Sequence, residues 1–456
     1  MRKMTFPLLT LIIALLPFSD LNAQESSNIP EKMQWFTDAK LGIFIHYGIY
    51  AVNGISESWS FYNGEISYDD YMKQLDGFTA SKYDPEGWAE LFAEAGAKYA
   101  VLTSKHHDGV ALWDTKQSDL SVVKKSPAGR DLLTPYAEAL RKNDLKVGLY
   151  FSHLDWSHPD YATVHNGPIS APNNVNPFDY PGPEESFPDR WSNFLDFHRG
   201  QIKELNDLIS PDLWWFDGDW SRTAEQWKMK ELRDTLLAWN PESILNSRMS
   251  GYGDYATPEQ GIPVVAPDGP WELCMTINDS WGYQVGDNNH KSVNYIIRTF
   301  ADCIGMGGNL LLDVGPMEDG TITPEQTRVL KGLGRWTRKH SEAIYGTTRG
   351  LPFGHYYGPT TLSKDGTILY LFVLDIPRDD LVVKGIRNKV KNVRVAGTDQ
   401  SLAFERNGGA PWHNIPGVLM IELKEAQLDK NVTVVAIEMD GPVDLFRGKG
   451  GAIEAN

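Results

Sequence analysis

A carboxylate ends a short apolar stretch that is rich in tryptophan. The stretch Leu213-Trp214-Trp215-Phe216 runs directly into Asp217 and Gly218. An unbroken apolar run of this length is typical of a strand buried on both faces, and a carboxylate at its carboxyl end lies where barrel enzymes carry their chemistry. Asp217 is therefore a candidate nucleophile. Taken alone, Asp217-Gly218 equally fits a plain turn or the cap of a following helix.

A second carboxylate is needed if the chemistry is cleavage of a glycosidic bond, because one group attacks or activates water and the other protonates the leaving oxygen. The tetrapeptide Thr-Pro-Glu-Gln occurs at residues 257–260 and again at 323–326. The second copy opens an amphipathic run, as a helix cap does. The first copy meets Gly261 and Pro263, which no useful helix survives. We therefore expect Glu259 on a loop, as the candidate acid/base.

Glu272 is the alternative acid/base. It follows Trp271, and an aromatic neighbour raises the pKa of a carboxyl group by removing water from it. Both candidates stay open at this point, with Glu259 favoured because of its loop position.

Further polar residues follow the other predicted strands, and all would face the same rim of a barrel. Strand-end histidines and carboxylates also bind zinc in barrel hydrolases, but neither a His-x-His pair nor a His-Glu-x-x-His helix is present. Neutral imidazoles that bind sugar hydroxyls explain the same residues, so we predict no metal and no cofactor. The residues at this rim are His46, Lys105, His106, His107, Asp108, Tyr150, Asp155 and Arg248.

The order of elements predicts an α/β fold. Apolar strands alternate with amphipathic helices, which indicates a parallel sheet, and eight such strands would close a (β/α)8-type barrel. A poorly patterned region at 261–275 is expected to hold the strands that are not evident. The evident strands are 41–46, 99–103, 147–151, 213–216, 244–245 and 310–314.

The pattern changes after Tyr345-Gly346. Short β-rich runs separated by Gly, Asn, Asp and Pro predict a C-terminal antiparallel β-sandwich. We expect the catalytic (β/α)8-like barrel to occupy residues 24–347 and the sandwich residues 348–456.

The amino terminus predicts export. Met1-Arg2-Lys3, an apolar stretch and small residues up to Ala23 are typical of a secretory signal peptide over residues 1–23, too short for a mature membrane anchor. The protein would then be periplasmic or secreted. Cys274 and Cys303 are the only cysteines, so no disulfide framework is expected, and whether they pair is left open.

The composition favours a neutral ligand. The formal net charge is −17 and basic residues never run beyond a pair, which argues against a nucleic-acid partner. The 15 Trp and 19 Tyr residues suit stacking on sugar rings, although many will be core.

Ordered motifs across the predicted barrel resemble those of the α-L-fucosidases of glycoside hydrolase family 29. The resemblance runs from about Trp35 to Tyr345, and the C-terminal sandwich fits the same family. Its motifs are GIFIHYG at 42–48, KHHDG at 105–109, GLYFS at 148–152 with Asp155-Trp156, WFDG at 215–218, and GGNLLL at 307–312.

This resemblance implies a retaining, exo-acting α-L-fucosidase that removes terminal α-L-fucose from oligosaccharides or glycoconjugates through a covalent fucosyl-enzyme. By motif position, Asp217 matches the nucleophile and Arg248 the arginine near the acid/base Glu259. Ser58 separates the Glu57 and Trp59 that resemble the family's Glu-Trp pair, and Asp313 stands where an Asn is expected. The residues matching sugar-binding positions are His46, Glu57, Trp59, His106, His107, Tyr150 and Trp215.

Two other functions stay open, a metal-dependent barrel hydrolase and a non-catalytic sugar-binding protein on this scaffold. The sequence predicts neither the fucosyl linkage and aglycone nor the oligomeric state.

Overall fold

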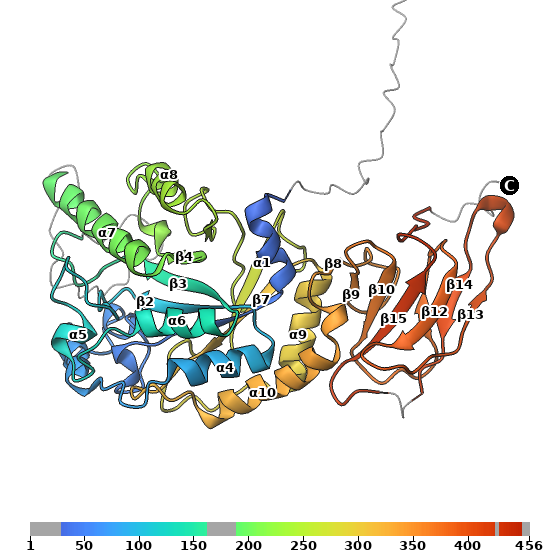
Figure 1. Cartoon of the computed structure of the whole chain (residues 1–456), viewed down its shortest axis with the longest axis horizontal. Helices are drawn as coiled ribbons and strands as arrows, with labels where there is room; N and C mark the ends of the chain where they lie inside the picture. The colour runs from blue at the N-terminus through green and yellow to red at the C-terminus, as the bar shows by residue number, and fades with distance from the viewer. Residues whose placement is uncertain (1–28, 162–187, 425–427, 449–456) are drawn as a thin grey trace, which may run out of the picture.

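The computed structural model describes residues 29–161, 188–424 and 428–448 (Figure 1), so the predicted signal peptide lies outside the described residues. A parallel seven-stranded sheet has the order β5-β4-β3-β2-β1-β7-β6. Each evident strand of the sequence is present, and β6 lies in the poorly patterned region. The strands are β1 (Leu41–Ile45), β2 (Tyr99–Lys105), β3 (Lys146–Ser152), β4 (Leu213–Asp217), β5 (Ile244–Leu245), β6 (Glu272–Thr276) and β7 (Asn309–Val314).

An irregular stretch, residues 254–260, fills the gap between the two edge strands of this sheet. We call it the closing segment. At its start the Asp254 N–H donates to the Leu245 carbonyl over 2.7 Å, and further along the Cys274 N–H donates to the Pro258 carbonyl over 3.1 Å. Backbone hydrogen bonds thus run from β5 through the closing segment to β6, which confirms the (β/α)8-type barrel with one irregular member.

Helices surround the barrel, and side chains cap several of them. The Asp84 side chain accepts the Gly87 N–H at the start of α4, and Thr323 accepts the Gln326 N–H at the start of α10. The α-helices are α1 (Gln34–Ala39), α2 (Trp59–Tyr62), α3 (Tyr68–Met72), α4 (Pro85–Ala95), α5 (Val122–Lys125), α6 (Leu133–Lys142), α7 (Pro188–Ile209), α8 (Met229–Trp239), α9 (Val293–Gly305) and α10 (Pro324–Lys339). Short 3-10 helices cover Glu31–Met33, Ile49–Ala51, Lys73–Gly77, Asp219–Ser221, Ser341–Ala343 and Pro411–His413.

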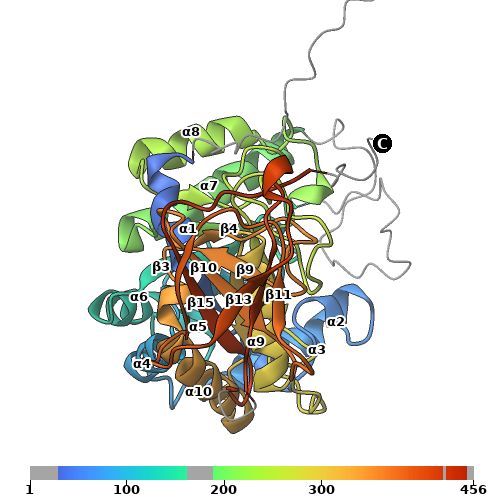
Figure 2. The same cartoon turned by 90° about the vertical axis from the view of Figure 1, so that its right-hand side faces the viewer.

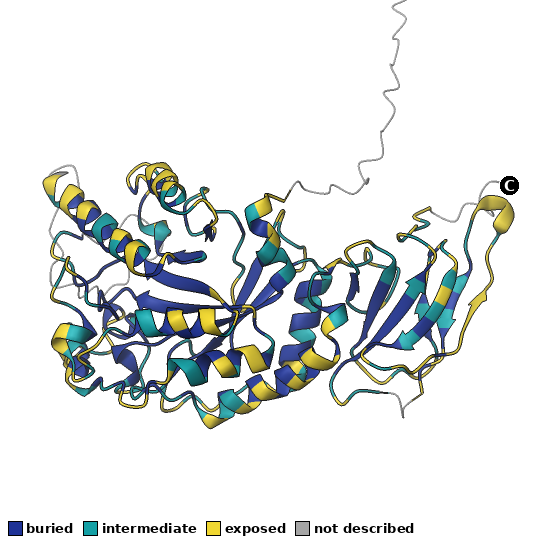
Figure 3. Ribbon diagram, viewed as in Figure 1, coloured by how far each residue is buried: buried dark blue, intermediate teal, exposed yellow. Residues whose placement is uncertain are grey.

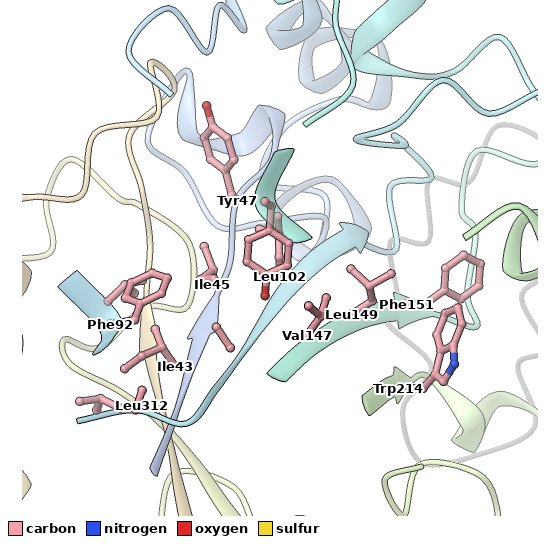
Figure 4. Packing of buried hydrophobic residues seen from close by; sticks show 14 of the residues in the cluster. Ile43, Ile45, Tyr47, Phe92, Leu102, Val147, Leu149, Phe151, Trp214 and Leu312 are labelled. Carbon is pink, nitrogen blue, oxygen red and sulfur yellow. The ribbon is translucent and has the colours of Figure 1, made fainter. Parts of the chain in front are cut away.

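The barrel strands are buried on both faces, which explains their unbroken apolar sequences (Figure 3). Ile43 and Leu312 point toward the helices, and Figure 4 shows Phe92 of α4 beside them. Phe44 and Trp215 belong instead to a cluster inside the barrel. Alternate residues of one strand therefore serve two cores, and polar groups two positions further along the inner face reach the rim.

The C-terminal region is an antiparallel sandwich, as predicted. One sheet has the order β12-β15-β10-β9-β8 and the other β11-β14-β13, with an apolar core between them. Figures 1 and 2 show the sandwich at one end of the molecule, beside α9 and α10. Its strands are β8 (Thr348–Arg349), β9 (Thr360–Leu362), β10 (Ile368–Val373), β11 (Leu381–Val383), β12 (Val390–Val395), β13 (Phe404–Asn407), β14 (Val418–Ile421) and β15 (Thr433–Met439).

Candidate active site

The polar residues singled out in the sequence gather at the carboxyl ends of the barrel strands. His46 follows β1, His106 and His107 follow β2, Asp217 is the last residue of β4, and Arg248 comes shortly after β5. Because all these strands are parallel, their ends meet at one rim.

Asp217 is buried at this rim and held by groups from several elements. Its Oδ1 atom lies 2.8 Å from Arg248 Nη1, and the Tyr150 hydroxyl donates to its Oδ2 atom over 2.9 Å. The Nε2 atom of His107 is 3.6 Å from the same Oδ2. Burial raises the pKa of the Asp217 carboxyl above its ordinary value, whereas the Arg248 guanidinium and the Tyr150 hydroxyl act to lower it.

One guanidinium connects the two carboxylates proposed for catalysis. Arg248 donates from Nη1 to Asp217 and from Nη2 to Glu259 Oε2, the second over 2.7 Å. Burial acts to lower the pKa of Arg248, but both carboxylates raise it above its ordinary value, so the side chain stays charged. Glu259 lies in the closing segment with its side chain 41% exposed, whereas that of Asp217 is 12% exposed. The pair thus joins an enclosed carboxylate to one open to solvent.

Glu272 lies at the other end of the barrel. It is the first residue of β6, whereas Asp217 is the last of the parallel strand β4. Its carboxylate is fully buried and accepts hydrogen bonds from the Tyr99 hydroxyl and, over 3.1 Å, from Trp215 Nε1. Burial raises the pKa of Glu272 to about 7. The sequence correctly anticipated a desolvated carboxyl group, but the structure places it beneath the site, behind Trp215.

The three histidines of the site are buried and uncharged at neutral pH. Burial lowers the pKa of His46 and His106 well below the ordinary value and that of His107 to about 3. His46 Nδ1 lies 2.7 Å from an Asp313 oxygen, which leaves its Nε2 for a ligand. Asp313, in the position where an Asn was expected, is itself buried, and burial and the nearby Glu57 raise its pKa.

Two serines give His106 and His107 opposite tautomers. Ser152 donates to the Leu154 carbonyl over 2.8 Å, so it accepts from His107 Nδ1 over 2.6 Å and leaves His107 Nε2 as an acceptor. Ser58 Oγ accepts the N–H of Asp108 over 2.8 Å, and the acceptor that the described residues offer its own hydrogen is His106 Nδ1, 2.6 Å away. His106 Nε2 therefore carries a hydrogen. The site offers one donor and one acceptor side by side, as a pair of sugar hydroxyls requires.

Glu57 adds a buried acceptor to the same pocket. Burial raises the pKa of its carboxyl group, and the backbone N–H groups of Glu57 and Gly282 act to lower it. Within the described part of the chain, its Oε2 atom has no hydrogen-bond partner. Trp59 stands edge-on to His107, with ring centres 5.5 Å apart. An unpaired buried oxygen suits a sugar that brings its own hydroxyl donor.

Sequence reasoning missed two aromatic residues of the site. Trp281 lies with its ring centre 5.0 Å from that of His46, and Phe44 lies 4.5 Å from His46 and 4.9 Å from Trp215. Phe44 could have been found, because it is two residues before His46 on the same strand and so shares its face. Trp281 follows β6 in a polar loop, and no local pattern points it toward the site.

Cys274 and Cys303 are both buried free thiols. Over the described ranges, no group of three or more His, Cys, Asp and Glu side chains is arranged to hold a metal ion. Among the helices described, none is both long and apolar enough to cross a membrane.

Comparison with known proteins decides the family. The sequence model of the α-L-fucosidases matches residues 20–342. The chain belongs to the α-L-fucosidase family, glycoside hydrolase family 29. The tissue α-L-fucosidase of Bos taurus is 32% identical over 407 residues, 82% of each chain. This family assignment accounts for the ordered motifs found in the sequence.

Solved structures of α-L-fucosidases share the whole architecture. Isoenzyme 1 from Paenibacillus thiaminolyticus superposes with a TM-score of 0.80 at 32% identity, covering 90% of this chain and 99% of that one. A family 29 α-L-fucosidase from Bacteroides thetaiotaomicron, trapped as a covalent intermediate with 2-fluoro-fucosyl fluoride, has a TM-score of 0.78 at 26% identity, covering 90% of this chain and 96% of that one. That enzyme therefore passes through a covalent intermediate.

Proposed function

We propose that this chain is a retaining, exo-acting α-L-fucosidase in which Asp217 is the nucleophile and Glu259 the acid/base. The observation that carries the assignment is the Arg248 bridge, which joins both carboxylates at the carboxyl rim of a family 29 barrel. Glu272 is the weaker candidate because its carboxylate is fully buried at the opposite strand end. Retaining enzymes hold their two carboxyl groups about 5–5.5 Å apart, and carboxylates that share one guanidinium suit that spacing.

The reaction uses both carboxylates twice. Asp217 attacks the anomeric carbon and forms an ester to the sugar while Glu259, in its protonated form, gives its proton to the departing oxygen. Glu259 then takes a proton from water, whose oxygen attacks the same carbon and releases Asp217. The two displacements return the original anomeric configuration. Arg248 keeps Asp217 ionised and Tyr150 donates to it, so the nucleophile is ready before the sugar arrives.

The substrate is a terminal α-L-fucose of an oligosaccharide or glycoconjugate. Its hydroxyls meet the donor of His106, the acceptor of His107 and the unpaired oxygen of Glu57, together with His46. Its methyl group packs against the indoles of the site, Trp215 and Trp59 among them. The protein's own groups supply every proton transfer in this scheme, so a chelator should leave turnover unchanged.

The proposed domain limits and location follow the sequence. The signal peptide occupies residues 1–23, the catalytic barrel 24–347 and the sandwich 348–456, and cleavage near Ala23 releases a periplasmic or secreted enzyme. Amino-terminal sequencing of the exported protein tests this. A first residue far from Gln24 would contradict it.

Trapping of the intermediate tests the mechanism. After incubation with 2-fluoro-fucosyl fluoride, peptide mass spectrometry should find the label on Asp217. Asp217→Gly should lose turnover of an aryl α-L-fucoside by roughly 10⁴-fold and regain part of it with azide, which replaces the missing nucleophile. A label on another residue, or fucose released with inverted configuration, would falsify the assignment. Binding of fucosides without turnover would instead indicate a sugar-binding protein.

A further inference from the structure

His153 lies between the backbones of the two residues that form the charged pair of the site. The backbone N–H of His153 donates to the Asp217 carbonyl over 2.7 Å, and the Nε2 atom of its ring is 3.1 Å from the Arg248 carbonyl oxygen. The side chain is fully buried and stacks on Phe216, with ring centres 4.8 Å apart and an angle of 7° between the planes. His153 therefore contacts the main chain of both Asp217 and Arg248, while its imidazole stays buried.

Two residues of α7 hold His153 from the outside of the barrel. Its Nδ1 atom lies 3.1 Å from Nε2 of His198, and Nδ1 of His198 lies 2.7 Å from Nη1 of Arg199. Arg199 is anchored in turn by a hydrogen bond to the Trp227 carbonyl. A continuous line of side chains thus runs from Arg199 through both histidines to the backbone of Arg248.

The hydrogen bonds along this line can point in only one direction. Arg199 only donates, so His198 accepts at Nδ1 and carries its hydrogen on Nε2. His153 then accepts at Nδ1 and donates from Nε2, which is what the Arg248 carbonyl needs. The Arg248 carbonyl oxygen can only accept, so reasoning from that end also places the hydrogen of His153 on Nε2. Burial lowers the pKa of His153 to about 3 and that of His198 well below its ordinary value, so both rings stay neutral.

We propose that His153, oriented by His198 and Arg199, is a positioning residue that fixes the Arg248 backbone and thereby holds the guanidinium against the nucleophile. This inference rests on the proposed roles of Asp217 and Arg248. A side chain that swings from an unanchored backbone loses its contact, and a misplacement of about 1 Å in a catalytic constellation costs about 100-fold in rate. The line also links a helix outside the barrel to the chemistry within it.

Loss of this anchor has a specific consequence for pH dependence. The charged and titratable groups facing Asp217 are Arg248 from the loop after β5, Tyr150 from β3 and His107 from the loop after β2. Only Arg248 among them depends on His153. A looser Arg248 stabilises the ionised Asp217 less, so the acid limb of kcat/KM moves to higher pH. A merely structural defect would lower activity at every pH without moving that limb.

Two substitutions at one position separate these cases. His153→Gln places an amide N–H near the former Nε2 atom, whereas His153→Leu removes the donor at similar volume. We expect His153→Leu to lose about 10- to 100-fold in kcat/KM, with its acid limb moved to higher pH, and His153→Gln to recover most of the rate and the original limb. His198→Leu, which leaves His153 in place, should move the limb in the same direction by less, and serves if His153→Leu does not fold.

The pH profiles of the variants are compared with labelling of the wild-type protein by 2-fluoro-fucosyl fluoride. If wild type is labelled at Asp217 but the limb is unchanged in the Leu variants, or Gln and Leu behave alike at position 153, the positioning role is wrong and the proposed function stands. If wild type is labelled elsewhere, the proposed function fails and the positioning role fails with it. A limb that moves in His153→Leu and returns in His153→Gln supports the inference.

Discussion

The two carboxylates proposed for catalysis share one cationic partner. Arg248 faces two carboxylates, and its guanidinium also lies over the Trp215 ring, 5.1 Å from its centre. In the proposed mechanism such a cation both keeps the nucleophile ionised and holds the acid/base near it. The protonation of Asp217 and the position of Glu259 are therefore coupled through one side chain.

Replacing Arg248 should move the acid limb of activity. Burial already raises the pKa of Asp217, and the guanidinium opposes that rise. In Arg248→Gln the opposing charge is gone, so the pKa of Asp217 increases and the acid limb of kcat/KM shifts to higher pH. The rate at the optimum should also fall, by about 100-fold, because Glu259 loses its anchor. A pH–rate profile that keeps the wild-type limb would show that Arg248 does not control the nucleophile.

Glu272, the alternative acid/base, offers a test at a residue that the proposed mechanism leaves out of the chemistry. Its pKa rises from 4.5 in the unfolded chain to about 7 in the folded protein, so the folded state holds a proton that the unfolded state loses between these pH values. The contribution of Glu272 to the free energy of unfolding is therefore fully present below pH 4.5. It is lost as the pH rises through 7, by on the order of 3 kcal/mol. Glu272→Gln keeps an acceptor for Trp215 and removes the titration.

We expect the thermal midpoint of Glu272→Gln to exceed that of wild type increasingly between pH 4.5 and 7.5, with kcat within about threefold of wild type because the carboxyl group does not reach the sugar. Differential scanning fluorimetry across pH and a steady-state assay measure both. A large loss of kcat in Glu272→Gln, with Glu259→Gln still active, would reverse the assignment of the acid/base.

At the scale of elements, the site depends on helices that fix the barrel from outside. Helices α4 and α10 cross closely at Gly334, where an added Cβ atom would lie 2.1 Å from the Glu94 carbonyl oxygen. Because that obstacle is backbone, it cannot rotate away. The close crossing brings α10 against the helix that packs on the first strands of the barrel.

Gly334→Ala should force α4 and α10 apart. We expect it to lower the free energy of unfolding by about 1–3 kcal/mol, despite the better helix propensity of alanine. Lys331→Ala, on the exposed face of the same helix, controls for propensity alone and should change stability little. Urea denaturation compares the two variants. Equal stability of both would mean that the two helices adjust without cost.

Elements with a strong local pattern were predictable from the sequence. The strands buried on both faces and the capped helices α4 and α10 needed only apolar spacing and terminal residues. The closing segment was not recognised as a barrel member, because its pairing comes from β5 and β6 rather than from its own residues. Edge strands such as β8, only two residues long, carry too little pattern to detect.

Some residues of the candidate site were likewise predictable from local sequence, and others were not. Residues that directly follow strands, such as His46 and Asp217, were placed at the rim by sequence because parallel strands share one end. Contacts between distant parts of the chain could not be predicted. Trp281 reaches His46 from a loop far along the chain, and Ser58 contacts His106, which lies 48 residues further along the sequence. No periodicity records such contacts.

At the scale of the whole molecule, the sandwich is packed against the barrel through a second apolar face. Along β10, Leu371 points into the sandwich core, whereas Phe372 belongs to the core that includes the barrel. The ring centre of Phe372 lies 6.2 Å from that of Trp336 in α10. Arg394 of the sandwich binds both carboxylate oxygens of Glu342 over 2.7 Å each. The five-stranded sheet therefore stabilises both parts at once.

This shared core predicts that barrel and sandwich unfold together. Phe372→Ala removes contacts at the junction and Leu371→Ala removes them inside the sandwich, each at a cost of about 2–5 kcal/mol. If the barrel and the sandwich are coupled, both variants show one transition in calorimetry. Activity and the circular dichroism signal of β-sheet are then lost at the same temperature. If the sandwich were independent, Leu371→Ala would show an early transition that leaves fucosidase activity intact. We expect the coupled result, because Phe372 on the outer face of β10 belongs to the same apolar core as the barrel residues.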